Sequence, residues 1–94
     1  MSRSVPSGYV LTEHALVQMA RRGLSRSLVE GIVRRPEQRL PAGPDRAILQ
    51  SRELGPETSK AYLVRVLVDV GKAPPEVVTA YRTSKVSKYW EDAT

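Results

Sequence analysis

The stretch Lys60-Ala-Tyr-Leu-Val-Arg-Val-Leu-Val-Asp-Val70 decides the fold, because it is the most strand-like run in the chain. In an extended backbone, successive side chains point to opposite faces. One face would carry Tyr62, Val64, Val66, Val68 and Val70. The other face would carry Leu63, Arg65, Leu67 and Asp69. The pattern predicts the strongest strand of the protein, with one apolar face.

Further strands are predicted on both sides of this run. Residues 46–53 alternate in the same way, and residues 38–40 can form a short strand before a turn rich in Pro and Gly. Residues 54–59 are expected to form a loop. A turn at residues 71–75 leads into the last strand, residues 76–82. Because these connections are short, successive strands should pair antiparallel.

Two helices are predicted before these strands. Thr12 is a favourable N-cap for a helix over residues 13–22, which Gly23 is suited to end. Ser25 can cap a second, amphipathic helix over residues 26–35. Two helices followed by three or four strands predict an α+β fold, with both helices packed on one face of an antiparallel sheet. The other face would be free to bind a partner.

Length and composition narrow the class of protein. The 94 residues suffice for one domain, expected over residues 9–94 after a flexible tail at residues 1–8. The net charge of +5 favours nucleic acid or another acidic partner, although some small basic proteins have neither. The absence of cysteine excludes disulfides, and a single histidine without a carboxylate cluster argues against a metal site. With no signal peptide or membrane-spanning run, we expect a cytoplasmic protein without a cofactor.

A dense run of donors, Ala80-Tyr81-Arg82-Thr83-Ser84-Lys85, closes the last predicted strand. A guanidinium, two hydroxyls and an amine in one short run are typical of a phosphate-binding site. The alternative is an ordinary polar strand end. In that case Arg82 would pair with Glu76 or Asp69 across the sheet, and a hydroxyl would cap the following turn.

The single histidine, His14, lies in the first turn of the first predicted helix. At 100° per residue, it shares a polar stripe with Gln18 and Arg21, opposite the apolar arc. The positive end of the helix dipole disfavours the imidazolium form, and a neutral imidazole can act as a general base. The alternative is an ordinary exposed histidine.

Two further features concern the free face of the sheet. Arg65 is a cation within the most apolar strand, so it must point to that face or find a partner. Facing outward, it would extend the cationic surface of the last strand. Tyr89-Trp90 is the one pair of adjacent aromatic residues; it is suited to base stacking, but we favour an apolar cover that packs the tail onto the sheet.

Two segments together resemble a family of small bacterial proteins. They are the opening Thr12-Glu-His14-Ala15 with Met19-Ala-Arg-Arg-Gly23, and the close Thr79-Ala-Tyr-Arg-Thr-Ser-Lys85 before Lys88-Tyr-Trp90. The family is a domain-of-unknown-function group similar to BrnT and, more distantly, to the RelE/ParE toxin superfamily. The resemblance covers nearly the whole chain, from Thr12 to Trp90.

The resemblance implies a RelE-like fold and a metal-independent endoribonuclease of the toxin type. RNA, free or on the ribosome, would be the substrate, and a small acidic antitoxin would be a partner. The catalytic residues carried over are His14, Arg82, Thr83, Ser84 and Lys85. Substrate-binding residues would be Gln18, Arg21, Arg65 and Tyr81. The ribosome-dependent toxins carry a denser set of cations on their central strands, where this chain has little besides Arg65.

The chemistry expected of such a site is attack of the RNA 2′-hydroxyl on the adjacent phosphate. His14 would act as the base and Arg82 would bind the phosphate, with Thr83 or Ser84 donating to a non-bridging oxygen. The acid stays unassigned, because Lys85 or Tyr81 would need a shifted pKa to serve. Two other functions remain open: a module that binds nucleic acid or a protein partner without cutting, and a ParE-like toxin that acts on a protein target.

Overall fold

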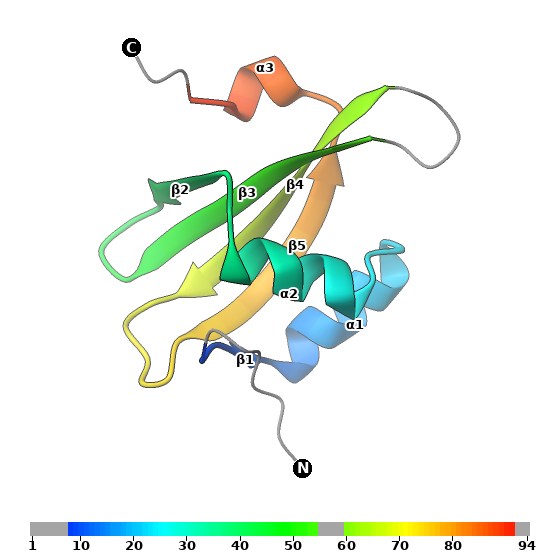
Figure 1. The fold of residues 1–94 in the computed structure, drawn as a ribbon. Helices are drawn as coiled ribbons and strands as arrows, with labels where there is room; N and C mark the ends of the chain where they lie inside the picture. The colour runs from blue at the N-terminus through cyan, green and yellow to red at the C-terminus, as the bar shows by residue number, and fades with distance from the viewer. Residues whose placement is uncertain (1–7, 55–59, 92–94) are drawn as a thin grey trace.

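The computed structural model describes residues 8–54 and 60–91, which form an α+β domain (Figure 1). In chain order the elements are β1 (Val10–Leu11), α1 (Glu13–Arg21), α2 (Arg26–Arg34), β2 (Gln38–Pro41), β3 (Arg46–Leu54), β4 (Ala61–Asp69), β5 (Glu76–Thr83) and α3 (Val86–Tyr89). The five strands form one sheet in the order β1-β5-β4-β3-β2. The predicted α+β class is therefore confirmed, and β4 is the central strand of the sheet.

The sheet differs from the predicted one in its first strand. The pairs β2–β3, β3–β4 and β4–β5 are antiparallel, but β1 pairs parallel to β5. The expectation of a purely antiparallel sheet with three or four strands was wrong, since the sheet is mixed and has five. Strand β1 has only two residues, so its sequence shows no alternation from which it could be predicted. It forms because its backbone reaches the start of β5, where Val10 N donates to Pro75 O at 2.8 Å. The expected tail at residues 1–8 lies outside the described residues except for Gly8.

The core lies between the helices and one face of the sheet. On β4 the alternation places Val64, Val66 and Val68 inside, each fully buried. Both helices contribute to the same apolar cluster, α1 through Ala15 and Met19. From α2 come Val29, Ile32 and Val33. Helix α1 packs along β5, and α2 packs across β3 and β4.

The two helix starts are set by the predicted caps. The Thr12 hydroxyl accepts from Ala15 N at 3.1 Å, and the Ser25 hydroxyl accepts from Leu28 N at 3.1 Å. Thr12 also donates its own hydroxyl proton to Val77 O at 2.9 Å, which attaches the start of α1 to β5. This tie fixes the position of the first helical turn relative to the sheet.

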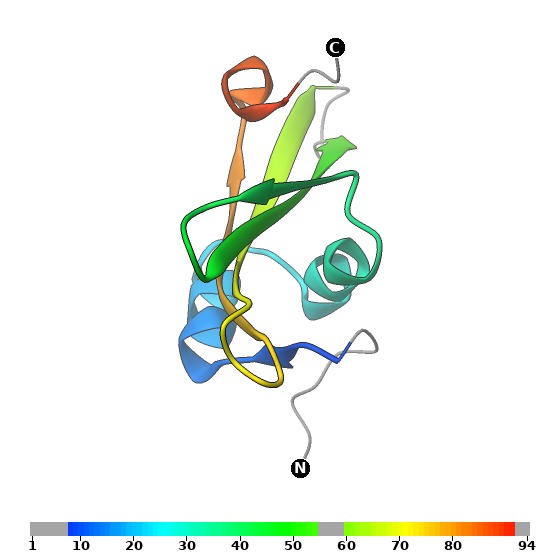
Figure 2. The ribbon, with the colours of Figure 1, turned by 90° about the vertical axis from the view of Figure 1, so that its left-hand side faces the viewer.

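The second face of the sheet is covered at one end. Helices α2 and α3 lie on opposite sides of the sheet (Figure 2), and the segment that contains α3 crosses the face that points away from the core. No helix within the described ranges 8–54 and 60–91 is long and apolar enough to cross a membrane. The contacts beneath α3 contain most of the polar chemistry of this face.

Candidate functional site

Four polar side chains form a row across the sheet, on the face away from the core. The strand register places Gln38 of β2 opposite Gln50 of β3, Gln50 opposite Arg65 of β4, and Arg65 opposite Tyr81 of β5. We call these four residues the polar row. They come from four different strands, so only the folded sheet brings them together.

The polar row is linked by hydrogen bonds along its length. Arg65 Nε donates to Gln50 Oε1 at 2.8 Å, and Arg65 Nη1 donates to the Tyr81 hydroxyl oxygen at 2.8 Å. Gln50 Nε2 donates to Gln38 Oε1 at 2.7 Å. Gln50 is fully buried and Arg65 is 8 % exposed. A buried and connected set of this kind holds the guanidinium in a fixed orientation.

Arg65 is a buried cation whose partners are neutral. Among residues 8–54 and 60–91, no ion pair joins it to a carboxylate. Besides its two hydrogen bonds, the guanidinium lies 4.2 Å from the ring centroid of Tyr89 and 5.9 Å from that of Tyr81. Buried arginines are normally paired with an anion, because their charge is costly to remove from water. The row therefore presents a positive charge that an anionic ligand can neutralise.

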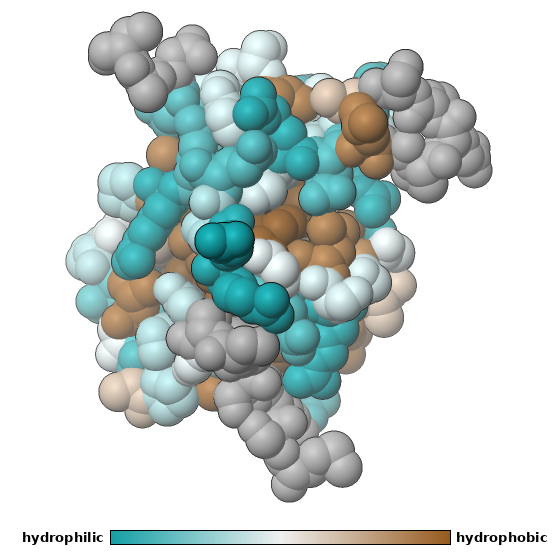
Figure 3. Space-filling view, in the orientation of Figure 1, coloured by the Kyte–Doolittle hydropathy of each residue, from teal (hydrophilic) through white to brown (hydrophobic). Residues whose placement is uncertain are grey.

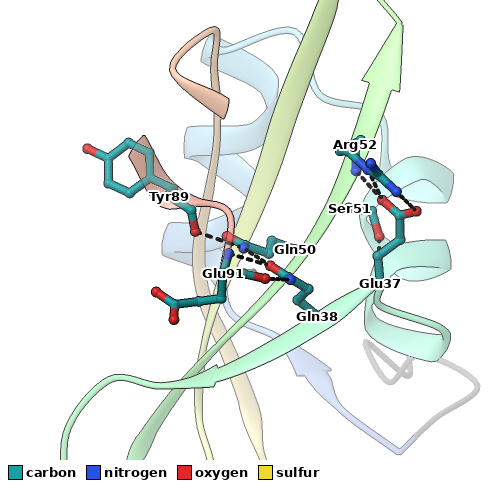
Figure 4. A network of polar contacts seen from close by, with 7 residues as sticks. All are labelled: Glu37, Gln38, Gln50, Ser51, Arg52, Tyr89 and Glu91. Carbon is teal, nitrogen blue, oxygen red and sulfur yellow. Dashed lines mark hydrogen bonds and ion pairs between the residues drawn. The ribbon is translucent and has the colours of Figure 1, made fainter. Parts of the chain in front are cut away.

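A C-terminal segment covers the row. We call residues 86–91 the C-terminal cover. Its backbone is bound by the two glutamines of the row: Gln50 Nε2 donates to Tyr89 O at 3.1 Å, and Gln38 Oε1 accepts from Glu91 N at 3.1 Å (Figure 4). Gln38 Nε2 in turn donates to Glu91 O. Of the two alternatives for Arg65, the structure therefore shows the one in which it finds partners, and the cover keeps it from extending an exposed cationic surface.

Trp90 of the cover lies against a second cation. The guanidinium of Arg52 is 4.2 Å from the Trp90 ring centroid. Glu37 fixes this arginine, because its carboxylate accepts from Arg52 N at 2.7 Å and from Arg52 Nε and Nη2 at 3.2 Å each (Figure 4). The side-chain bond from Arg52 holds the pKa of Glu37 below its ordinary value, and the same bond raises the pKa of Arg52. Tyr89 and Trp90 are both half-buried against the sheet, which confirms the favoured interpretation of this pair as a cover.

The predicted run at the end of β5 is divided between the two faces of the sheet. Tyr81 joins the polar row, whereas Arg82 lies opposite Val64 on the other face and is exposed. The Thr83 hydroxyl accepts from Lys85 N at 3.1 Å, so it closes the turn into α3. Ser84 and Lys85 are exposed in that turn. The structure thus does not gather these residues into one phosphate-binding site.

His14 lies at the opposite end of β5 from Arg82. Its helix is attached through Thr12 to Val77, which pairs with Val68 of β4, whereas Arg82 pairs with Val64. At about 3.3 Å per residue along β4, these two levels are roughly 13 Å apart. The imidazole is exposed, as the helical geometry predicted. His14 and Arg82 therefore belong to opposite ends of β5.

The other two residues of the α1 stripe also stay apart from the polar row. Gln18 is half-buried and Arg21 is exposed on the helix. The residue that caps the C-terminal end of α1, Arg22, instead makes polar contacts with β5: its Nη1 donates to Thr79 Oγ1 at 3.1 Å and to Ala80 O at 2.8 Å. Arg22 thus provides a hydrogen-bond donor for the Ala80 carbonyl, which lies on the part of β5 that does not pair with β1.

Sequence reasoning missed Gln38 and Gln50 as site residues. A usable signal was present, because Gln50 is an amide in a strand of alternating apolar residues, like Arg65 in β4. Pairing the two strands in register would have placed the amide beside the cation. Gln38 could be added only after the short strand β2 had been aligned on β3.

A shallow hollow lies between α2 and β3. Its volume is about 230 Å³, and its lining mixes apolar and charged side chains, including Ile32, Arg35 and Glu53. Figure 3 shows this side of the molecule, where apolar side chains appear among hydrophilic ones. None of the predicted site residues lines the hollow. Within the described part of the chain, no three His, Cys, Asp or Glu side chains are placed to hold a metal ion.

Comparisons with known proteins do not assign the site. No family model matches the chain, and searches of curated proteins and of solved structures find no match either. The resemblance to the BrnT and RelE/ParE group therefore stays a prediction.

Proposed function

We propose that the protein is a toxin-type domain that binds RNA on the sheet face carrying the polar row. The observation that carries the proposal is the buried positive charge of Arg65, which has only neutral partners among the described residues. A phosphate of the RNA backbone would supply the missing anion. Arginine is suited to this role because its planar fork donates to two acceptors at once.

The RelE-like fold belongs to the same proposal. Two helices precede four strands that pair antiparallel in consecutive order, and the short α3 follows on the other face. The net charge of +5 suits both RNA and a small acidic antitoxin. We place the RNA contacts at Arg65 and Tyr81, with Lys85 and Lys88 adding positive charge at the end of β5 and in α3.

The geometry best supports RNA binding without a cleavage step in which His14 acts as the base. In a metal-free cleavage, base and phosphate must lie within hydrogen-bond reach of the same nucleotide. The level of β5 to which the start of α1 is attached lies roughly 13 Å from Arg82, which is more than one hydrogen bond spans. His14 is therefore left out of the proposed site.

Ribonuclease activity through Tyr81 is a second candidate. Arg65 donates to the Tyr81 hydroxyl oxygen, which leaves the phenolic proton free to be given to a leaving oxygen beside the bound phosphate. Induced expression in a bacterium tests it. New 2′,3′-cyclic phosphate RNA ends with the wild type but not with Tyr81→Phe would support cleavage at this site.

The proposal is tested by RNA titration with two charge-matched variants. Arg65→Met removes the buried cation, and Arg34→Met removes an exposed cation from α2 on the other side of the sheet. A labelled single-stranded RNA of about 12 nucleotides is titrated by fluorescence anisotropy at several salt concentrations. We expect Arg65→Met to weaken binding at least tenfold and to reduce the salt slope by about 0.7, the value of one phosphate contact on a single strand. Equal losses of RNA affinity in the two variants, or no RNA binding by the wild type, would overturn the proposal.

A further inference from the structure

The C-terminal cover has contacts that a nucleotide could make in its place. We infer that residues 89–91 occupy the position of one unpaired RNA nucleotide and that RNA must displace them to bind. The inference rests on the proposed function and adds an internal competitor to it. Three observations on the cover support it, namely its pairing with Gln38, its ring over Arg65 and its weak attachment.

The first observation is the two-way pairing between Gln38 and Glu91. The Gln38 amide accepts from Glu91 N and donates to Glu91 O, so it binds an adjacent donor and acceptor together. Every nucleobase presents an adjacent donor and acceptor on its Watson–Crick edge, and glutamine and asparagine amides bind base edges in this bidentate manner. The backbone N–H and C=O of Glu91 thus satisfy an amide that an unpaired base would satisfy equally well.

The second observation is the ring stacked over the buried cation. The Tyr89 ring centroid lies 4.2 Å from the Arg65 guanidinium, at the distance of a stacked pair. Nucleobases stack on arginine guanidinium groups in the same manner. A base in place of the Tyr89 ring would keep this contact, and its phosphate would add the anion that Arg65 lacks among the described residues.

The third observation is the weak attachment of the cover. Helix α3 has four residues and no buried side chain, and its N-cap Lys85 makes no side-chain capping bond. The cover is held by hydrogen bonds to two glutamines and by rings over two arginines. Segments with few buried apolar contacts open at low free-energy cost. Release of the cover therefore does not require unfolding of the sheet.

Competition of this kind makes RNA affinity depend on the stability of the cover. If RNA binds only when the cover is open, the apparent affinity is the intrinsic affinity multiplied by the open fraction. A substitution that weakens the cover without changing the polar row must therefore tighten RNA binding. Such a variant distinguishes a cover that competes with RNA from a cover that contributes to RNA binding.

The experiment compares Glu91→Pro with Glu91→Ala in the full chain. Proline has no N–H, so the bond to Gln38 Oε1 is lost, whereas alanine removes the same exposed carboxylate and keeps that bond. Trp90 is extended at ψ 127°, a conformation that the residue before a proline adopts readily. We expect Glu91→Pro to bind the 12-nucleotide RNA about 2- to 10-fold more tightly than Glu91→Ala, the range that one hydrogen bond gives.

Trp90 reports the movement directly, because it is the single tryptophan of the chain. We expect RNA to shift its emission to the red and to increase its quenching by acrylamide, and a fully paired duplex of the same sequence to do neither. Equal RNA affinity of the two Glu91 variants, or weaker binding by Glu91→Pro, would overturn the inference. So would RNA binding that leaves Trp90 equally protected. These outcomes leave RNA binding itself intact, whereas an absence of binding by every variant would reject the proposed function.

Discussion

Arg65 and Tyr81 lie opposite each other on β4 and β5, and the guanidinium Nη1 donates to the Tyr81 hydroxyl oxygen at 2.8 Å. Tyr81→Phe removes this acceptor and leaves a buried charged donor without a partner. We expect the free energy of unfolding to fall by about 1–3 kcal/mol, the usual cost for a hydrogen bond to a charged group. Urea denaturation followed by circular dichroism measures it.

The matched control for this change is Tyr62→Phe, on the other face of β4. It removes the same hydroxyl from a half-buried tyrosine outside the polar row. A loss of stability as large in Tyr62→Phe as in Tyr81→Phe would contradict the importance assigned to the bond between Arg65 and Tyr81.

The pair of Glu37 and Arg52 predicts a dependence of stability on pH. Arg52 holds the pKa of Glu37 below the ordinary value of 4.5, so the folded state releases this proton more readily than the unfolded state. The resulting stabilisation is fully present above pH 4.5 and is lost as the pH falls through the lower pKa of the folded state. Because both side chains are exposed, the effect should be small and reduced by salt.

This prediction is checked with Glu37→Gln, which cannot titrate. The difference in the free energy of unfolding between wild type and Glu37→Gln should be constant from pH 7 to about pH 5 and should shrink toward pH 2. If the difference in the free energy of unfolding were the same at pH 2 and at pH 7, the charge of Glu37 would contribute nothing to stability.

The N-caps predict a difference between two similar substitutions. Ser25→Ala removes one hydrogen bond to the backbone and should cost about 1 kcal/mol. Thr12→Ala removes the cap and also the bond to Val77 O, so we expect a loss of about 2 kcal/mol. Thermal unfolding of both variants and of Thr12→Ser tests this, and equal losses in the two alanine variants would exclude a tie between α1 and β5.

His14 should be dispensable for RNA binding. The imidazole is exposed near the start of β5, away from the polar row and from Arg82. We expect His14→Ala to bind the 12-nucleotide RNA within about twofold of wild type, since a side chain outside the interface contributes little. If His14→Ala abolished binding, or abolished RNA cleavage found with the wild type, the site would have to be moved to α1.

The parts of the fold that local signals specify could be predicted from the sequence. The two caps and the alternation of β4 depend on residues within one turn or one strand, and the structure confirms them. Strand β1 could not be found, because its two residues are positioned by pairing with β5, 65 or more positions later. Local pattern contains no information on such a distant partner.

The candidate site was predicted only in part for the same physical reason. Tyr81 and Arg65 were identified from their chemistry, but their meeting depends on strand register. The cover depends on a bond between Gln38 and Glu91, which are 53 positions apart. The grouping of Arg82 with Tyr81 failed because adjacent residues of a strand point to opposite faces. Chemistry read along the chain thus identified the residue types but not the surface they share.

The central claim is that RNA binds the sheet face of the polar row, and chemical-shift mapping by NMR tests it most directly. The ¹⁵N-labelled protein is titrated with the 12-nucleotide single-stranded RNA. We expect the largest changes at the side-chain amides of Gln38 and Gln50, at Arg65 Nε–H and at the indole N–H of Trp90. Changes confined to α1 and α2, with the polar row unaffected, would contradict the account.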